Sequence, residues 1–238
     1  NRHQDELCLY GVNPRSTVSQ LIIKESVPKY VKEEAIEGAI VGKNTILLPS
    51  DRDGYMHIYI YGMNGQQIRK VGDGNYDITA IYGYDETTGD VYYQAAALNA
   101  HDRQVYVSHK NGKTERLTNQ EGWNSAIFSA DYEYFINTWS DYNTPYVYTV
   151  RNKSGKILST ILDNHELKQT AQQYGFTKKE TFSFTTSEGV KLDGWMVKPA
   201  DFDASRKYPV IMFQYSGPGS QQVVNSWNAG SMGQGGAF

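Results

Sequence analysis

The residues best suited to chemistry lie near the end of the chain, around Tyr215. An apolar run from Lys207 to Phe213 predicts a strand buried on both faces. Tyr215 follows this run, and Gly217, Pro218 and Gly219 predict a stiff, tight turn beyond it. The simplest interpretation of Tyr215 is an aromatic residue at the end of a strand. A phenol that the turn aims inward can also donate a hydrogen bond to the oxyanion that forms during acyl transfer.

A serine nucleophile and its general base are not evident in the sequence. Hydrolases of the α/β type carry the nucleophile in a G-x-S-x-G turn. Ser216, Ser220 and Ser231 lie close to glycines but lack that spacing. We interpret the five histidines as solvated or turn residues: His3, His57, His101, His109 and His165.

Two acidic pairs, Asp51 with Asp53 and Asp73 with Asp77, are candidates for calcium loops. A calcium loop requires an Asp-x-Asp-x-Asp-Gly ladder with a later Glu, and neither pair has one. We therefore interpret these carboxylates as turn residues, and we predict no metal and no organic cofactor.

The composition is that of a globular protein, with 238 residues, 39% hydrophobic and 21% charged. The net charge is -3 and no basic stripe is visible, so a nucleic-acid partner is not expected. No apolar run approaches the roughly 20 residues that span a bilayer. The first residue, Asn1, gives no indication of the compartment.

Tyrosine-bearing strands repeat along the chain. Tyr59, Tyr106 and Tyr148 each lie in a strand that runs into an Asn-Gly or Ser-Gly turn, at spacings of 47 and 42 residues. Residues 9–13 match residues 60–64 at a spacing of 51. Such turns predict β-hairpins, with positive φ expected at both turn residues. A period of 40 to 50 residues with paired strands is typical of β-propeller blades.

Further strands complete about four blades of four antiparallel strands. They are predicted at residues 45–48, 79–82, 90–94, 124–128 and 134–138. Because a propeller normally closes its ring to remove edge strands, we expect this chain to be part of a longer protein. Its open edges also allow a homodimer.

The architecture changes after the last repeat. A short helix is predicted from residue 163 to 174, capped by Asp163 or Asn164. A hairpin at 180–198 and the apolar run at 207–213 follow. The predicted fold class is mainly β, a partial propeller followed by the first strands of an α/β-hydrolase domain. We divide the chain into propeller (1–162), linker helix (163–177) and truncated hydrolase (178–238).

Three segments resemble the dipeptidyl peptidase IV-like serine peptidases of the prolyl oligopeptidase superfamily. Residues 50–59 (SDRDGYMHIY) are similar to a propeller segment of that family. Residues 182–199 (FSFTTSEGVKLDGWMVKP) and 207–221 (KYPVIMFQYSGPGSQ) resemble the opening of its catalytic domain. The resemblance covers nearly the whole chain and is strongest from Lys178 onward.

The resemblance implies a propeller that caps an α/β-hydrolase domain with a Ser, Asp, His triad. The implied reaction releases N-terminal dipeptides from peptides with a penultimate Pro or Ala. Since the triad would lie beyond Phe238, we expect the chain by itself to be inactive. The family also suggests export to a periplasm or cell surface.

The resemblance also implies roles for individual residues. Tyr215 would donate its phenol to the oxyanion. Ser220 and Gln221 would lie on the leaving-group side, and Tyr30 would line the substrate pocket. Where some relatives carry Cys in the loop, this chain has Gly219, which excludes a thiol contact there.

Other interpretations remain open. Glu33 and Glu34 resemble the acidic pair that binds the substrate amine in this family, but they precede a late blade, so we interpret them as a solvated turn. A prolyl tripeptidyl peptidase or an acylaminoacyl peptidase would share most of these features. A non-catalytic propeller that binds partners is the alternative from another class.

Overall fold

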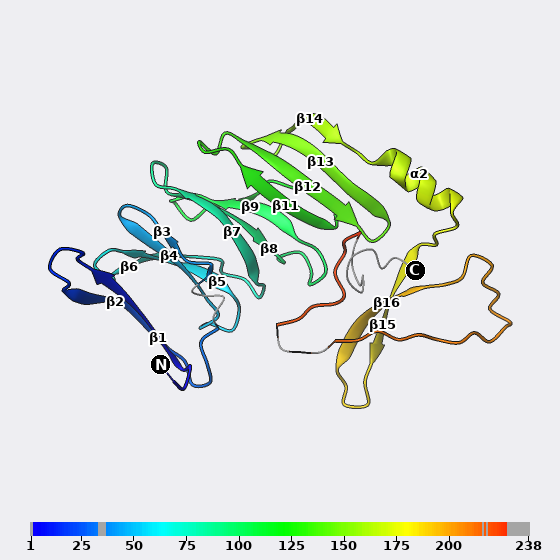
Figure 1. Cartoon of the computed structure of the whole chain (residues 1–238), viewed down its shortest axis with the longest axis horizontal. Helices are drawn as coiled ribbons and strands as arrows, with labels where there is room; N and C mark the ends of the chain where they lie inside the picture. The colour runs from blue at the N-terminus through cyan, green and yellow to red at the C-terminus, as the bar shows by residue number, and fades with distance from the viewer. Residues whose placement is uncertain (1, 33–36, 216, 218, 228–238) are drawn as a thin grey trace. The chain divides into compact units, whose positions relative to one another are not determined.

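The computed structural model describes residues 2–32, 37–215, 217 and 219–227 (Figure 1). The fold is mainly β, as predicted. The described residues form three four-stranded and two two-stranded sheets, in which the strand pairs are antiparallel. The chain divides into two compact units, one of Asn1–Ala97 with Val105–Arg116 and one of Leu98–Gln104 with Leu117–Phe238.

The first unit holds a two-stranded sheet and two four-stranded sheets. The two-stranded sheet pairs β1 (Glu6–Val12) with β2 (Ser19–Ser26). The next sheet has the order β3 (Ile40–Val41), β4 (Thr45–Ser50), β5 (His57–Gly62) and β6 (Gln67–Val71). The third has the order β10 (Thr114–Arg116), β9 (Gln104–Ser108), β8 (Asp90–Ala95) and β7 (Ile78–Asp85). Sequential strands are neighbours throughout, which is the meander of a propeller blade.

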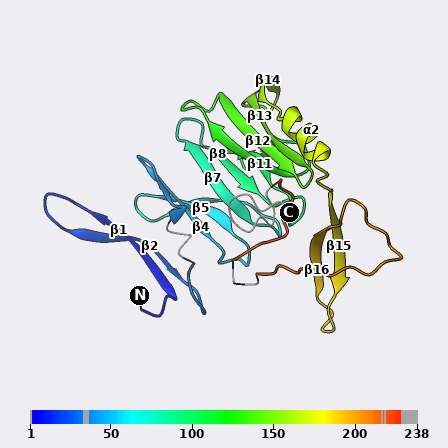
Figure 2. The same ribbon diagram turned by 45° about the vertical axis from the view of Figure 1, so that its right-hand side comes forward.

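The second unit begins with a four-stranded meander of β11 (Trp123–Phe128), β12 (Tyr134–Asp141), β13 (Thr144–Asn152) and β14 (Ile157–Leu162). The helix α2 (His165–Gln173) follows, and it lies beside the β13–β14 edge in Figures 1 and 2. The hairpin of β15 (Lys179–Thr185) and β16 (Lys191–Val197) comes next. Each of these strands, and the hairpin, matches a predicted one.

Both residues that were predicted as caps lie at the start of α2. Asn164 occupies the cap position in a left-handed conformation and makes no side-chain cap bond. Its amide instead donates to the Tyr146 carbonyl at 2.7 Å. The carboxylate of Asp163 accepts the backbone N–H of His165 at 3.1 Å. One residue therefore holds the helix against β13 while the other satisfies its first N–H group.

Three hairpin turns share one hydrogen-bond pattern, which confirms the sequence repeat. In the first, the Gly62 N–H donates to Gln66 O and the Gly65 N–H donates to Gly62 O, both at 2.9 Å. The same two bonds recur between residues 109, 112 and 113 and between residues 152, 155 and 156. Only the glycine of each turn has positive φ, at 80°, 87° and 82°. The expectation of two positive φ values was wrong, because these are longer turns closed by one left-handed glycine.

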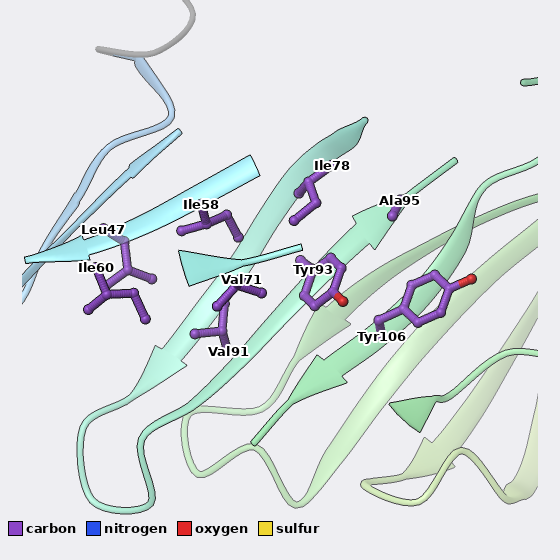
Figure 3. Close-up of a cluster of buried hydrophobic side chains, with 9 residues drawn as sticks. All are labelled: Leu47, Ile58, Ile60, Val71, Ile78, Val91, Tyr93, Ala95 and Tyr106. Atoms are coloured by element: carbon purple, nitrogen blue, oxygen red, sulfur yellow. The ribbon is translucent and has the colours of Figure 1, made fainter. Parts of the chain in front are cut away.

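The β3–β6 sheet is buried on both faces. Leu47, Ile58 and Ile60 contribute to a cluster with residues of β6 to β9, drawn in Figure 3. The alternate residues of β4 and β5 pack on the other face with Ile23 of β2. Successive side chains of a strand point to opposite faces. Strands covered on both sides therefore read as continuous apolar runs, which is how β4 and β5 appear in the sequence.

A buried ionic network ties β2 to the turn after β4. Glu25 is 5% exposed, and its carboxylate accepts Arg52 Nη2 at 2.6 Å and the Ser50 hydroxyl. Arg52 also donates to the Tyr61 hydroxyl at 2.8 Å and lies 4.0 Å above the Tyr59 ring. The buried carboxylate is thus paired and hydrogen-bonded, which is the condition for keeping a charge in the interior.

The strand predicted from Lys207 to Phe213 is absent from the structure. Val210, Ile211 and Met212 are 87%, 96% and 85% exposed. A strand that is buried on both faces needs neighbouring strands and covering layers. Within the described part of the chain, no strand pairs with this segment.

Two glycines at equivalent turns provide a matched test. An alanine Cβ at Gly65 would overlap the Ile22 carbonyl oxygen, whereas at Gly112 it would meet open space. Gly112→Ala should lower the free energy of unfolding by about 1 kcal/mol through left-handed backbone strain alone. Gly65→Ala should lower it further, as measured by urea denaturation. Equal effects would contradict the close approach of β2 to this turn.

The Glu25 network predicts a large loss of stability on truncation. Glu25→Ala removes the carboxylate that Arg52 and Ser50 share, and it should lower the free energy of unfolding by about 3 kcal/mol. Glu6→Ala is the control, because Glu6 forms a partly exposed ion pair with Lys24 at 2.5 Å, and its removal should change stability little. Thermal or urea unfolding of the two variants compares them directly. A small, equal effect of both changes would show that the network is not stabilising.

Candidate functional site

Tyr215 lies before a turn on the surface of the second unit. Its side chain is 62% exposed. The turn is closed by the Ser220 N–H, which donates to Gly217 O at 3.1 Å, and Gly219 has a φ of 77°. Positive φ at this position suits glycine. Ser216 and Pro218 lie outside the described residues.

Gln221 begins a segment that is bonded to the loop between β8 and β9. Its Oε1 accepts Arg103 Nη2 at 2.7 Å. Its Nε2 donates to the carbonyls of Ala100 at 2.6 Å and Val223 at 3.0 Å. Both ends of the Gln221 amide are therefore engaged by the protein itself.

Asn225 continues this attachment through its backbone N–H and both polar atoms of its side chain. Its backbone N–H donates to His101 O at 2.9 Å, and its side-chain Nδ2 donates to Asp102 Oδ1 at 2.8 Å. Its Oδ1 accepts the Tyr142 N–H at 2.9 Å. One amide side chain thus joins the loop after β8 to the turn between β12 and β13.

The end of the described segment has three further contacts. The Trp227 N–H donates to Ser140 Oγ at 3.2 Å, and Ser140 Oγ lies 3.4 Å from Ser226 Oγ. Lys179 Nζ donates to Trp227 O at 3.0 Å. We call residues 221–227 the docked segment, because it is held at both of its ends and in the middle.

Local hydrogen bonds explain why the loop after β8 can hold this segment. Asn99 Oδ1 accepts the N–H groups of His101 and Asp102, each at 2.8 Å, which closes a tight turn. Asp102 is 4% exposed and accepts bonds from Asn99, from the Gly122 N–H and from Asn225. Three donors around one buried carboxylate keep its charge satisfied.

The electrostatics at this site follow from burial. Burial, and then the negative charges of Asp102 and Asp193, raise the pKa of Tyr142 to about 12. Burial also lowers the pKa of Lys179. His101 Nε2 lies 3.1 Å from Asp193 Oδ2, which links the same loop to β16. The hydrogen bond from the Ser183 hydroxyl is the main cause that lowers the pKa of Asp193.

The other predicted site residues belong to different units. Ser220 accepts Gln222 Nε2 at 2.9 Å and is exposed. Tyr30 belongs to the first unit and is 51% exposed. Glu33 and Glu34 lie outside the described residues.

The histidines differ in part from the expectation. His57 is a buried strand residue at 3% exposure, bonded to Gly74 O at 3.1 Å, and burial lowers its pKa. It was wrongly interpreted as a solvated or turn residue. His109 and His165 lie within 3.0 Å of the carboxylates of Asp90 and Asp163.

The sequence analysis did not identify three residues of the site. Asp102 and Arg103 read as an ordinary charged turn before a buried strand, and Asn225 as a loop residue. The only available signal was a charged pair directly beside the apolar run of β9. It could not indicate a partner 118 or 123 residues away.

The described residues contain no group of three His, Cys, Asp or Glu side chains that could hold a metal ion. Asp53 accepts the Tyr59 hydroxyl and pairs with Lys70, and Asp77 accepts the Met56 N–H. In the same part of the chain, no helix has the length and apolar character needed to cross a membrane.

Comparison with known proteins identifies the family. A family model described as the dipeptidyl peptidase IV N-terminal region matches residues 1–146. The chain belongs to the dipeptidyl peptidase IV family. The predicted resemblance is thereby confirmed, and the four-stranded sheets correspond to the propeller region of these proteins.

Relatives of this dipeptidyl peptidase IV-family chain are known in sequence and structure. Dipeptidyl peptidase 4 of Arthroderma otae is 30% identical over 197 residues, which are 81% of this chain and 25% of that protein. The crystal structure of Porphyromonas gingivalis dipeptidyl peptidase 4 matches 96% of this chain and 33% of its own, at a TM-score of 0.90 and 38% identity. A putative dipeptidyl aminopeptidase IV from Bacteroides ovatus shares the fold, at a TM-score of 0.81 and 24% identity. The chain spans about a quarter of the length of the curated relatives it matches.

Asn225 offers a direct test of the docking. Asn225→Asp places a second carboxylate against Asp102, where the native amide donates, and should lower the free energy of local opening at neutral pH by about 2 kcal/mol. Hydrogen exchange of the backbone amides of residues 221–227 measures this opening. Adding Asp102→Asn should restore part of the protection, because an amide again faces a carboxylate. Unchanged exchange in Asn225→Asp would contradict the role of this contact.

Proposed function

We propose that this chain is part of a serine exopeptidase that releases N-terminal dipeptides with a penultimate Pro or Ala. The observation that carries the proposal is the match to Porphyromonas gingivalis dipeptidyl peptidase 4, which extends over 96% of the chain at 38% identity. This structural match thus continues well past residue 146, where the match to the family model ends. The relatives named dipeptidyl peptidase 4 support peptidase activity in the protein that contains this chain.

We divide the chain, as part of this proposal, into the second half of a propeller (1–162), a linker helix (163–177) and the start of an α/β-hydrolase domain (178–238). The exposed apolar residues Val210 to Phe213 support the last assignment. They have the composition of a strand inside a parallel sheet. Further strands and helices of the hydrolase domain would cover them.

Tyr215 is proposed to stabilise the oxyanion. In acyl transfer the attacked carbonyl becomes a tetrahedral oxyanion, and a preorganised donor stabilises it by about 3 to 4 kcal/mol. The Tyr215 phenol can donate a hydrogen bond to such an oxyanion. The reaction needs no metal or organic cofactor, since a serine nucleophile with its general base carries the chemistry.

Substrate contacts are proposed at Ser220 and Tyr30, which are both exposed. Gln221 would contact a substrate only by exchanging one of its present partners. The 238 residues contain no G-x-S-x-G sequence. The chain by itself would therefore be inactive, with the Ser, Asp, His triad supplied by other residues. The exposed edges of the sheets are compatible with a homodimer of the whole protein.

Hydrolysis of a Gly-Pro chromogenic amide by the full-length protein tests this function. Wild type should cleave it, and Tyr215→Phe should lower kcat about 100-fold by removing the donor. Tyr208→Phe is the matched control, because the Tyr208 hydroxyl accepts the Asp203 N–H at 2.9 Å in the same segment and should leave kcat unchanged.

Other outcomes would change the assignment. Cleavage of tripeptide or acylated substrates in place of Gly-Pro would favour a tripeptidyl or acylaminoacyl peptidase. A folded full-length protein that cleaves none of these substrates would favour a binding module. Cleavage that Tyr215→Phe leaves intact would remove Tyr215 from the mechanism while keeping the family.

A further inference from the structure

Arg103 is a buried residue of the site that no step of the proposed reaction uses. It is 6% exposed and comes directly before β9. Its Nη1 donates to the carbonyls of Ala100 and Asp102, each at 2.9 Å. The guanidinium also lies 4.7 Å from the Trp123 ring centre. Two carbonyls and an aromatic face thus fix the plane of the guanidinium.

The second terminal nitrogen of the guanidinium, Nη2, leads to Gln221. Arg103 Nη2 donates to Gln221 Oε1 at 2.7 Å, a charge-assisted bond. The Gln221 amide is held at its other end by the Ala100 carbonyl at 2.6 Å. The loop after β8 therefore binds Gln221 through two bonds of fixed direction.

Gln221 stands next to the turn that follows Tyr215. In that turn the Ser220 N–H donates to Gly217 O at 3.1 Å. Tyr215 precedes this turn and Gln221 follows it. Fixing Gln221 should therefore restrict the positions that Tyr215 can adopt. The second bonded residue, Asn225, keeps the docked segment from rotating about Gln221.

We propose that Arg103 is a positioning residue, which orients the Tyr215 loop for reaction by anchoring Gln221. This inference rests on the proposed function, in which Tyr215 is the oxyanion donor. Misplacing a catalytic group by about 1 Å can lower the rate on the order of 100-fold without weakening substrate binding. The effect of Arg103 should therefore appear in kcat and not in KM.

The test compares variants of the full-length enzyme on a Gly-Pro chromogenic amide, with rates normalised to folded protein. Arg103→Ala should lower kcat about 10- to 100-fold and change KM less than about threefold. In a Tyr215→Phe background the same change should have little further effect, because the residue it positions is already disabled. Arg103→Lys should recover only part of the rate, since an ammonium group lacks the planar fork.

Arg151→Ala is the matched control. Arg151 is 4% exposed in the same unit, and it bonds the Gln120 side chain and the Gly155 carbonyl. Its removal should lower stability but leave kcat of the folded enzyme unchanged. Hydrogen exchange of residues 219–227 should accelerate in Arg103→Ala and not in Arg151→Ala.

The outcomes separate this inference from the proposed function. Wild-type activity with an unchanged kcat in Arg103→Ala would overturn the positioning role, as would an equal loss in the wild-type and Tyr215→Phe backgrounds. An inactive wild-type enzyme would overturn the proposed function, and with it the catalytic consequence of the anchor. In that case unchanged exchange at 219–227 would overturn the anchor as well.

Discussion

Antiparallel pairing of the middle strands in each sheet is the constraint on which the rest of the structure depends. β4 is buried along its whole length, and so is β9. Buried backbone N–H and C=O groups must be paired, so each such strand needs a neighbour on both sides. The short outer strands β3 and β10 supply one side, and hairpin turns closed by left-handed glycines supply the connections. Repetition of this unit produces the propeller region of the dipeptidyl peptidase IV family.

The same constraint places polar loops at the ends of buried strands. The loop from Asn99 to Arg103 follows β8 and precedes β9, so its backbone is held by two buried strands. A loop fixed in this way can keep a buried carboxylate and a buried guanidinium in defined directions. Asp102 and Arg103 use those directions to bind residues more than a hundred positions further along the chain. The loop from Asn99 to Arg103 thereby binds the segment that follows Tyr215.

The last part of the chain contains both hydrogen-bonded polar side chains and exposed apolar side chains. Gln221 and Asn225 are bonded through their side-chain amides, while Val210, Ile211 and Met212 expose most of their surface. Large exposed apolar surfaces mark places where other protein covers the chain. The proposed function accounts for both features, since a hydrolase domain would bury the apolar residues and use the anchored loop.

The sequence by itself determined the repeat, the hairpins and the family, because Asn-Gly turns, strand alternation and the matched segments are local properties of neighbouring residues. It also made Tyr215 a candidate site residue, through its place before a glycine-rich turn. Only the tertiary structure decided that the Asn164 side chain bonds to the Tyr146 carbonyl, and that His57 is buried. Only the tertiary structure joined Asp102 and Arg103 to Asn225 and Gln221. Hydrogen bonds between residues so far apart depend on how sheets and loops pack, and no local pattern of residue types records that packing.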